Sequence, residues 1–151
     1  ILFNHESPLR PERFVTQKIV ATAIRIAAGS GETLTLGDLS IARDWGWAPE
    51  YVDAMWRMLQ HDTPGDYVVA TGQTYTLGEF VSEVFARLGL DWQDHVRVDE
   101  KLFRASEIRR SAANPARAEA TLGWVAQSAM PQVVRLMASA QLGLEGARRA
   151  I

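Results

Sequence analysis

The chain has 151 residues, of which 47% are hydrophobic and 23% charged, and its 16 basic and 18 acidic residues give a net charge of -2. This length fits one ordinary domain with its own hydrophobic core, and the composition excludes disordered and collagen-like classes. The near-neutral charge also excludes the broad basic surface with which proteins bind nucleic acid or an acidic membrane.

Cysteine is absent, which excludes disulfides and thiolate metal sites and is compatible with a reducing compartment. No apolar run approaches the roughly 20 residues that span a bilayer. We therefore expect a soluble, cytoplasmic protein with no membrane partner. The chain begins at Ile1 rather than Met, and its first three apolar residues are typical of the tail of a buried strand, so we expect a fragment.

Three elements are predicted in the first 37 residues. Residues 1–3 form a strand stub, which ends before a turn that contains two prolines. Apolar residues at three- and four-residue intervals predict an amphipathic helix over 14–28, with Gly29 as its stop. The alternation of polar and apolar residues over 33–36 predicts a half-buried strand.

A second helix begins near Pro49, which suits a first helical turn, and ends near Asp62, before a Pro-Gly pair. Its apolar residues recur with helical spacing and predict a stripe that faces the core: Tyr51, Val52, Met55, Trp56 and Leu59. Trp56 in particular is predicted to lie in the core.

The second half of the chain continues to alternate between predicted strands and predicted helices. A β-rich run over 67–70 predicts a buried strand, Thr76 caps a predicted helix over 77–88, and 96–98 predicts another strand. Residues 100–114 have no steady period and predict an irregular excursion. A short helix ending at Leu122 and a final helix from Met130 complete an α/β unit whose strands are too few for an independent doubly wound sheet.

The sequence predicts no catalytic centre and no metal site. The three histidines lie far apart, no glycine-rich phosphate loop is present, and no tyrosine is followed four residues later by lysine. Any anionic ligand must therefore be held by a few local cations.

Several charged residues lie in apolar or turn settings. Arg43 is suited to clamp a phosphate with two parallel hydrogen bonds, although a surface ion pair with Asp44 is the simpler interpretation. Arg104 and Glu107, three residues apart, share a face if they lie on one helical turn; there they offer donors and an acceptor to ribose hydroxyls, or they form a local salt bridge. Lys18 lies in the helix predicted over 14–28, where a solvated lysine is the usual interpretation.

The sequence resembles the GDP-mannose 4,6-dehydratases of the extended short-chain dehydrogenase superfamily. The resemblance rests on the segments Ile1-Leu2-Phe3-Asn4-His5-Glu6-Ser7-Pro8, Phe14-Val15-Thr16-Gln17-Lys18-Ile19, Arg43-Asp44-Trp45-Gly46, Asp53-Ala54-Met55-Trp56, Tyr67-Val68-Val69-Ala70-Thr71-Gly72 and Leu122-Gly123-Trp124, together with Phe103-Arg104 and Glu107. Their order and spacing also match, so the resemblance spans almost the whole chain.

This resemblance implies an α/β fold: the carboxy-terminal, substrate-binding part of an extended short-chain dehydrogenase, with small strands and several helices. The Rossmann half that carries NADP is then missing. Residues 1–13 would be the last strand and loop of the junction with the cofactor domain, and 14–151 the nucleotide-sugar-binding domain. The substrate-binding residues implied by family analogy are Asn4, Lys18, Arg43, Arg104 and Glu107, and the cofactor-facing residues are His5 and Arg10.

The implied activity is conversion of GDP-mannose to GDP-4-keto-6-deoxymannose with internal hydride return through NADP, by a homo-oligomer of the intact enzyme. The acid-base residues of the family lie outside this chain, so no catalytic residue is assigned, and the chain alone is expected to be inactive. Two alternatives stay open: a non-catalytic nucleotide-sugar-binding or assembly module, and another GDP-sugar epimerase or reductase. Departures from the family pattern include Leu9, Asp38 and Arg109.

Overall fold

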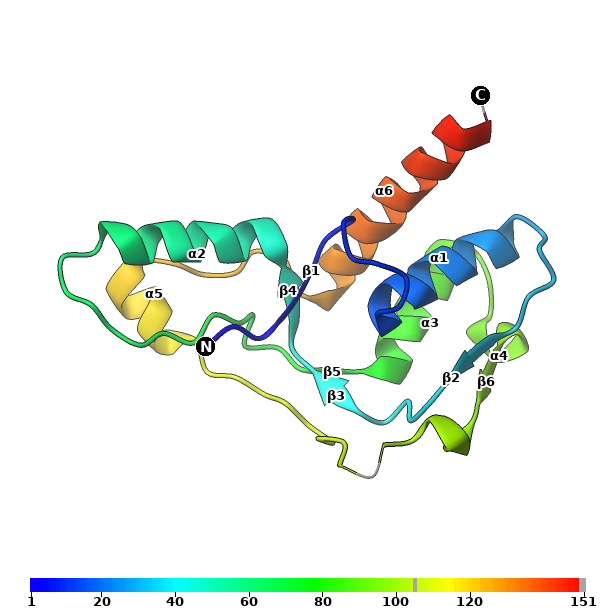
Figure 1. Ribbon diagram of the computed structural model, residues 1–151, viewed down its shortest axis with the longest axis horizontal. Helices are drawn as coiled ribbons and strands as arrows, with labels where there is room; N and C mark the ends of the chain where they lie inside the picture. The colour runs from blue at the N-terminus through cyan, green and yellow to red at the C-terminus, as the bar shows by residue number, and fades with distance from the viewer. Residues whose placement is uncertain (105, 150–151) are drawn as a thin grey trace.

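The structure, a computed structural model, describes residues 1–104 and 106–149, with the backbone alone for 144–149. It is a mixed α/β assembly with two groups of elements (Figure 1). The three helices of the first group, α1 (Val15–Ala27), α3 (Leu77–Arg87) and α6 (Met130–Arg149), pack against one another. β2 (Leu34–Leu36) pairs in parallel with β6 (Val96–Val98) beside them.

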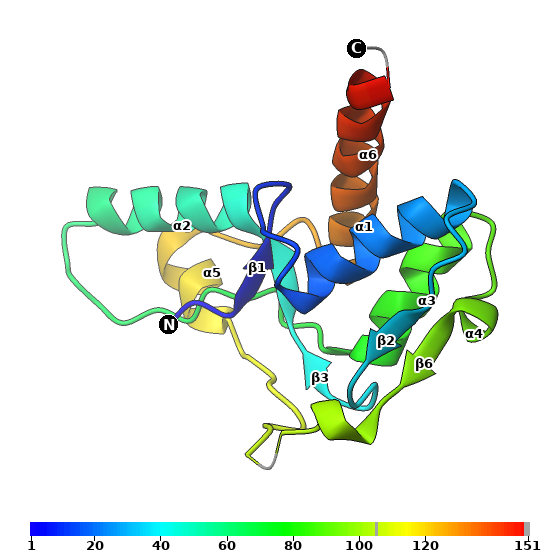
Figure 2. The same cartoon turned by 45° about the vertical axis from the view of Figure 1, so that its right-hand side comes forward.

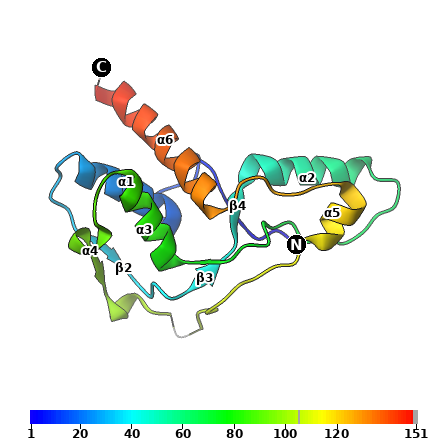
Figure 3. The same ribbon diagram turned by 180° about the vertical axis from the view of Figure 1, so that it is seen from behind.

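The second group contains α2 (Ala48–Gln60), α5 (Ala116–Leu122) and a parallel pair of strands, β1 (Asn4–Glu6) and β4 (Trp45–Trp47). A short antiparallel pair, β3 (Ala42–Arg43) and β5 (Tyr75–Thr76), lies between the two groups (Figures 1 and 2). Two short helices, α4 (Trp92–His95) and η1 (Glu100–Leu102), flank β6. Seen from behind, α3 crosses in front of α1, and the end of α6 projects away from the body (Figure 3).

Each group has its own hydrophobic core. The larger one, which we call the first core, is formed by the inner faces of α1, α3 and α6 with Trp45, whose ring lies 5.3 Å from that of Phe80. The second core lies between α2, α5 and the segment before residue 70, and consists of Tyr51, Ala54, Tyr67, Val69, Ala118 and Trp124. β4 lies between the two cores, because Trp45 and Trp47 pack on the first core and Gly46 faces Tyr51 of the second.

Most predicted elements are confirmed. The helices expected over 14–28 and 77–88 and the strands over 33–36 and 96–98 form, as do the excursion from residue 100 and the two final helices. The Thr76 cap is a full capping box, in which the Thr76 hydroxyl accepts from the Glu79 N–H and the Glu79 carboxylate accepts from the Thr76 N–H.

The prediction for the apolar stripe of α2 is wrong. Tyr51 and Ala54 are buried, but Val52, Trp56 and Leu59 are 60%, 59% and 82% exposed. The period of an apolar stripe shows which residues share a helix face, but burial also requires a neighbour that covers the face. In this fold α5 and β4 cover the side of α2 that carries Tyr51 and Ala54.

Residues 67–70 do not form the predicted strand. Tyr67, Val69 and Ala70 are buried as expected, but pairing is limited to one parallel bridge between Leu2 and Val69. The stub at 1–3 supplies that bridge, yet Ile1 is 78% exposed rather than buried. A β-rich run becomes a strand only when a neighbouring strand continues beside it, and here the two segments meet at one point.

Candidate functional site

A hollow of about 470 Å³ lies where the two groups of elements meet. Its apolar lining comes from Val15, Ile41, Trp45, Leu77, Leu102 and Phe103, and its polar lining from Asn4, Asp38, Arg43, Arg104, Glu107 and Arg109. Three arginines against two carboxylates leave an excess of one positive charge on these side chains. An apolar wall beside a few fixed cations suits an organic phosphate ester better than a free inorganic ion.

Arg43 is the most firmly held cation of this hollow. Its guanidinium donates to the Glu107 carboxylate at 2.6 Å and to the carbonyl oxygens of Ile108 and Ala42 at 2.7 and 2.8 Å. The predicted alternative, a surface ion pair with Asp44, is wrong because Asp44 is completely buried and accepts from the backbone N–H groups of Thr71 and Gly72. The neighbours of Arg43 therefore fix its planar donor group in one place.

Arg104 and Glu107 lie in the same hollow but not on one helical turn. The Glu107 N–H donates to the Arg104 carbonyl oxygen at 3.1 Å. The local salt bridge between them is also wrong, since Glu107 pairs with Arg43. Arg104 is exposed, so its guanidinium is open to a ligand.

Asn4 and His5 are neighbours on β1 with opposite surroundings. Asn4 is exposed and lines the hollow, opposite Trp45 in the β1–β4 register. The His5 Nδ1 lies 2.8 Å from the carbonyl oxygen of Phe3, and its ring packs on Tyr51 with 4.8 Å between centroids. The alternation of a strand thus places only Asn4 in the hollow.

Arg10 lies over the Phe14 ring and pairs with Glu6, the Nε to Oε2 distance being 3.0 Å. Glu6 is 1% exposed and accepts from the Thr16 hydroxyl at 2.9 Å. Burial raises the pKa of Glu6 above its ordinary value, although Arg10 and Thr16 oppose the shift. This cluster ties the end of β1 to the start of α1.

Lys18 is not in the hollow with the other predicted substrate residues. Its ammonium group donates to the Thr35 carbonyl oxygen at 2.7 Å and lines a separate hollow of about 480 Å³ between α1 and β2. Asp38, Arg109 and Phe103 line the main hollow but were not predicted as site residues. Asp38 and Arg109 are departures from the family pattern, but an acidic residue after a glycine at the end of a predicted strand is also common in ordinary turns.

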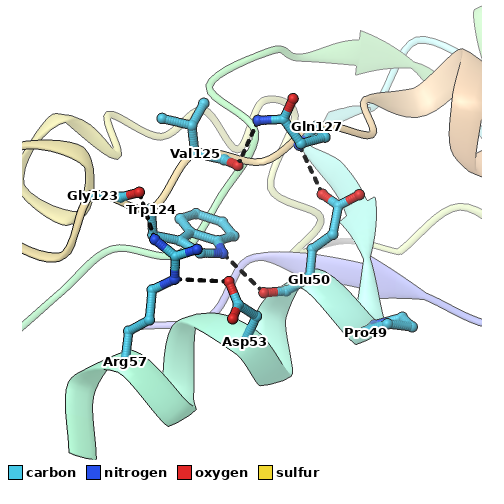
Figure 4. A pocket seen from close by; sticks show the side chains of 8 residues that line it. All are labelled: Pro49, Glu50, Asp53, Arg57, Gly123, Trp124, Val125 and Gln127. Carbon is cyan, nitrogen blue, oxygen red and sulfur yellow. Dashed lines mark hydrogen bonds and ion pairs between the residues drawn. The ribbon is translucent and has the colours of Figure 1, made fainter. Parts of the chain in front are cut away.

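A third hollow, of about 390 Å³, lies beside α2 (Figure 4). Its polar groups pair with each other: Arg57 contacts Asp53 and the Gly123 carbonyl oxygen, and the Trp124 indole donates to the Glu50 carbonyl oxygen. This arrangement fastens the α5–α6 connection to α2 and is structural. Among residues 1–104 and 106–149, we find no group of three metal-binding side chains and no helix that could cross a membrane.

Comparisons with known proteins agree on one family. The family model described as GDP-mannose 4,6 dehydratase matches residues 1–137. GDP-mannose 4,6 dehydratase 2 of Arabidopsis thaliana is 45% identical, with 95% of this chain and 39% of the relative covered. GDP-mannose 4,6 dehydratase of Homo sapiens is 38% identical, with 95% and 43% covered. The chain spans about two-fifths of the length of these relatives.

Solved structures confirm the expected fold class. The structure of RMD from Pseudomonas aeruginosa complexed with NADPH matches with a TM-score of 0.84 at 24% identity, over 95% of this chain and 47% of that one. A UDP-glucose 4-epimerase of Thermotoga maritima, solved with UDP-glucose, matches with a TM-score of 0.78 at 17% identity, over 95% and 45%. At these identities the likeness shows the fold alone. By the family model and the relatives together, the chain belongs to the GDP-mannose 4,6-dehydratase family.

Proposed function

We propose that this chain is the GDP-sugar-binding part of a GDP-mannose 4,6-dehydratase, and that the hollow at the junction of the two groups receives the nucleotide sugar. The observation that carries the proposal is that Asn4, Arg43 and the pair Arg104 and Glu107, from three distant parts of the sequence, line one hollow. The family membership and the excess positive charge support the same conclusion.

The roles we propose follow from the chemistry of each side chain. Arg43 and Arg104 bind the diphosphate, because guanidinium forks match phosphate oxygens. Glu107, already holding Arg43 through Oε1, accepts from ribose hydroxyls. Asn4 contacts the sugar-phosphate end, and Lys18 contributes to the nucleotide end only if its ammonium leaves the Thr35 carbonyl oxygen.

NADP, when bound, supplies the acceptor and donor of the hydride that leaves C4 of mannose and returns to C6 after water is lost across C5 and C6. We propose that most NADP contacts come from sequence outside this chain. Arg10 fits such a cofactor, because its side chain is 29% exposed while it pairs with Glu6 through Nε. His5 is held by Phe3 and Tyr51.

The bare face of α2 supports the idea that this chain works with further sequence. β1 and β4 are a pair of parallel strands, and parallel sheets in proteins have both faces covered by helices. Val52, Trp56 and Leu59 stand exposed on α2, the helix that contacts both strands. We propose that additional strands and helices of the longer protein cover them. The boundary between 1–13 and 14–151 stays a prediction, and the β1–β4 hydrogen bonds cross it.

The proposal is tested by GDP binding and by turnover in the full-length gene product. Arg43→Ala and Arg104→Ala should each weaken binding of GDP by about 1.5–3 kcal/mol, the usual worth of a hydrogen bond to a charged group. Arg87→Ala is the matched control, since Arg87 also pairs with a carboxylate at 2.6 Å but lies on α3, away from the hollow. Calorimetry measures the affinities.

Unchanged GDP affinity in both site variants would contradict the proposed site. Conversion of GDP-mannose to GDP-4-keto-6-deoxymannose tests the activity itself. Binding without turnover would favour the non-catalytic module, and turnover to a different GDP-hexose would favour an epimerase or reductase.

A further inference from the structure

Asp44 is a completely buried carboxylate with an unusual set of partners. Its Oδ1 accepts from the Thr71 N–H at 2.9 Å and its Oδ2 from the Gly72 N–H at 2.7 Å. Among the residues that the structure describes, no cation pairs with it. Burying a carboxylate is costly unless hydrogen bonds compensate, so these two bonds to consecutive N–H groups make Asp44 a clamp between two distant segments.

The clamp joins two places where the chain passes between the cores. Asp44 lies between β3 and β4, and Trp45, the next residue, enters the first core. Thr71 and Gly72 follow Val69 of the second core and precede β5. Gly72 has a φ of 76°, which glycine adopts without cost. The two crossings are therefore tied at one carboxylate.

Arg43 is enclosed by this arrangement. In the β3–β5 ladder Arg43 is paired with Tyr75. Tyr75 follows the clamped Thr71–Gly72 segment by a few residues. The clamp and the ladder therefore form a small closed ring of backbone with Arg43 on its circumference. On the other side, the Ala42 N–H donates to the Arg109 carbonyl oxygen at 2.7 Å, and the guanidinium is held by Glu107.

We infer that Asp44 is a positioning residue for nucleotide-sugar binding: its clamp on Thr71 and Gly72 fixes the backbone from which Arg43 reaches the ligand. The inference rests on the proposed function, in which Arg43 contacts the ligand. It assigns Asp44 itself no contact with substrate. Glu50 makes a comparable clamp, accepting from the N–H groups of Gln127 and Ser128 at 2.9 and 3.2 Å, but it lies on α2 and outside the hollow (Figure 4).

A double-mutant cycle on the full-length gene product tests the inference with GDP as the probe. Asp44→Asn keeps the size of the side chain but presents an amide N–H₂ to one of the two N–H donors. We expect it to weaken GDP binding about tenfold in the wild-type background and less than about twofold in the Arg43→Ala background, because its effect passes through Arg43. Glu50→Gln, the matched control, should lower the unfolding temperature without changing GDP affinity.

An equal loss in both backgrounds, or no loss in the wild-type background, overturns the inference, because Asp44 would then act on general stability alone. If Arg43→Ala and Arg104→Ala both leave GDP affinity unchanged, the proposed function fails; if only Arg43→Ala does, the inference fails because Arg43 has no contact for Asp44 to position. If Asp44→Asn does not fold, Gly72→Ala takes its place in the cycle. It strains the donor side of the same clamp and is expected to show the same dependence on Arg43.

Discussion

Gly46 lies directly against the ring of Tyr51 in the second core. A Cβ at position 46 would stand nearest to the Tyr51 Cε2 carbon, 2.7 Å from the hydroxyl oxygen and 2.8 Å from Cζ. The Tyr51 hydroxyl is buried with no hydrogen-bond partner among the described residues, and burial followed by the nearby Asp44 and Glu50 charges raises its pKa. The glycine of the Arg-Asp-Trp-Gly segment is thus explained by packing rather than by ligand binding.

Gly46→Ala should lower the free energy of unfolding by about 1–3 kcal/mol, the usual cost of overpacking a core. Urea denaturation measures the change. The control is Gly143→Ala on the open surface of α6, where no atom lies within 4 Å of the new Cβ; it should be neutral or stabilising by up to about 1 kcal/mol. A Gly46→Ala protein as stable as the wild type would show that the Tyr51 ring is free to move aside.

Glu6 makes stability depend on pH in a direction opposite to that of an ordinary paired carboxylate. Because burial raises its pKa above the ordinary 4.5, the folded state holds the proton more tightly than the unfolded state. The contribution of Glu6 is therefore complete below pH 4.5 and is lost as the pH rises through the folded-state pKa.

Glu6→Gln removes this titration. The stability of the variant relative to the wild type should improve steadily as the pH rises from 4.5 toward neutrality. Urea denaturation at a series of pH values measures the difference between the two proteins. A difference that is constant with pH, or that changes in the opposite direction, would mean that the Arg10 ion pair outweighs burial.

At the scale of elements, α3 shows how a local signal fixes a boundary. The Thr76 hydroxyl and the Glu79 carboxylate exchange bonds with each other's backbone N–H groups at 3.1 and 2.6 Å. These bonds satisfy donors that a helix start leaves without partners. Both participants lie within four residues, so the helix start is readable from sequence.

Thr76→Ala should destabilise the protein by about 1 kcal/mol, the typical cost of losing a helix cap. Ser82→Ala, at an exposed position in the middle of the same helix, is the control and should change stability by no more than about 0.5 kcal/mol. Chemical denaturation with one probe compares the two variants. Equal effects would show that the α3 start is held by core packing instead of its cap.

At the scale of the whole molecule, the exposed side of α2 is the largest departure from what the sequence predicts. Val52, Trp56 and Leu59 form an apolar face with no described neighbour over most of its area. Surfaces of this kind in folded proteins mark contacts with other structure. The chain covers about two-fifths of its relatives, which is consistent with a cover supplied by further sequence.

Leu59→Glu should therefore have different effects in two settings. In the 151-residue chain the side chain is 82% exposed, and the charge should cost less than about 0.5 kcal/mol. In the longer protein it should cost several times more, because a charge would be buried against apolar neighbours. Leu142→Glu, at an exposed position on α6, is the control. A small effect of Leu59→Glu in both settings would contradict the proposed cover.

The sequence by itself determined the local structure and the family. Helical and strand periods, the Thr76 cap and the glycine stops are written in neighbouring residues, so α1, α3, β2 and β6 were predicted within one or two positions. The residues that carry the family resemblance also include seven that line the hollow, among them the polar residues Asn4, Arg43, Arg104 and Glu107.

Only the tertiary structure decided which of these residues meet and what holds them. The partner of Arg43 is Glu107, 64 residues away, and that of Asp44 is a backbone loop 27 residues away. Tertiary structure also left the α2 stripe uncovered and placed Lys18 outside the main hollow. Local patterns record the period and capping of an element, whereas long-range contacts depend on how elements pack, which no single segment encodes.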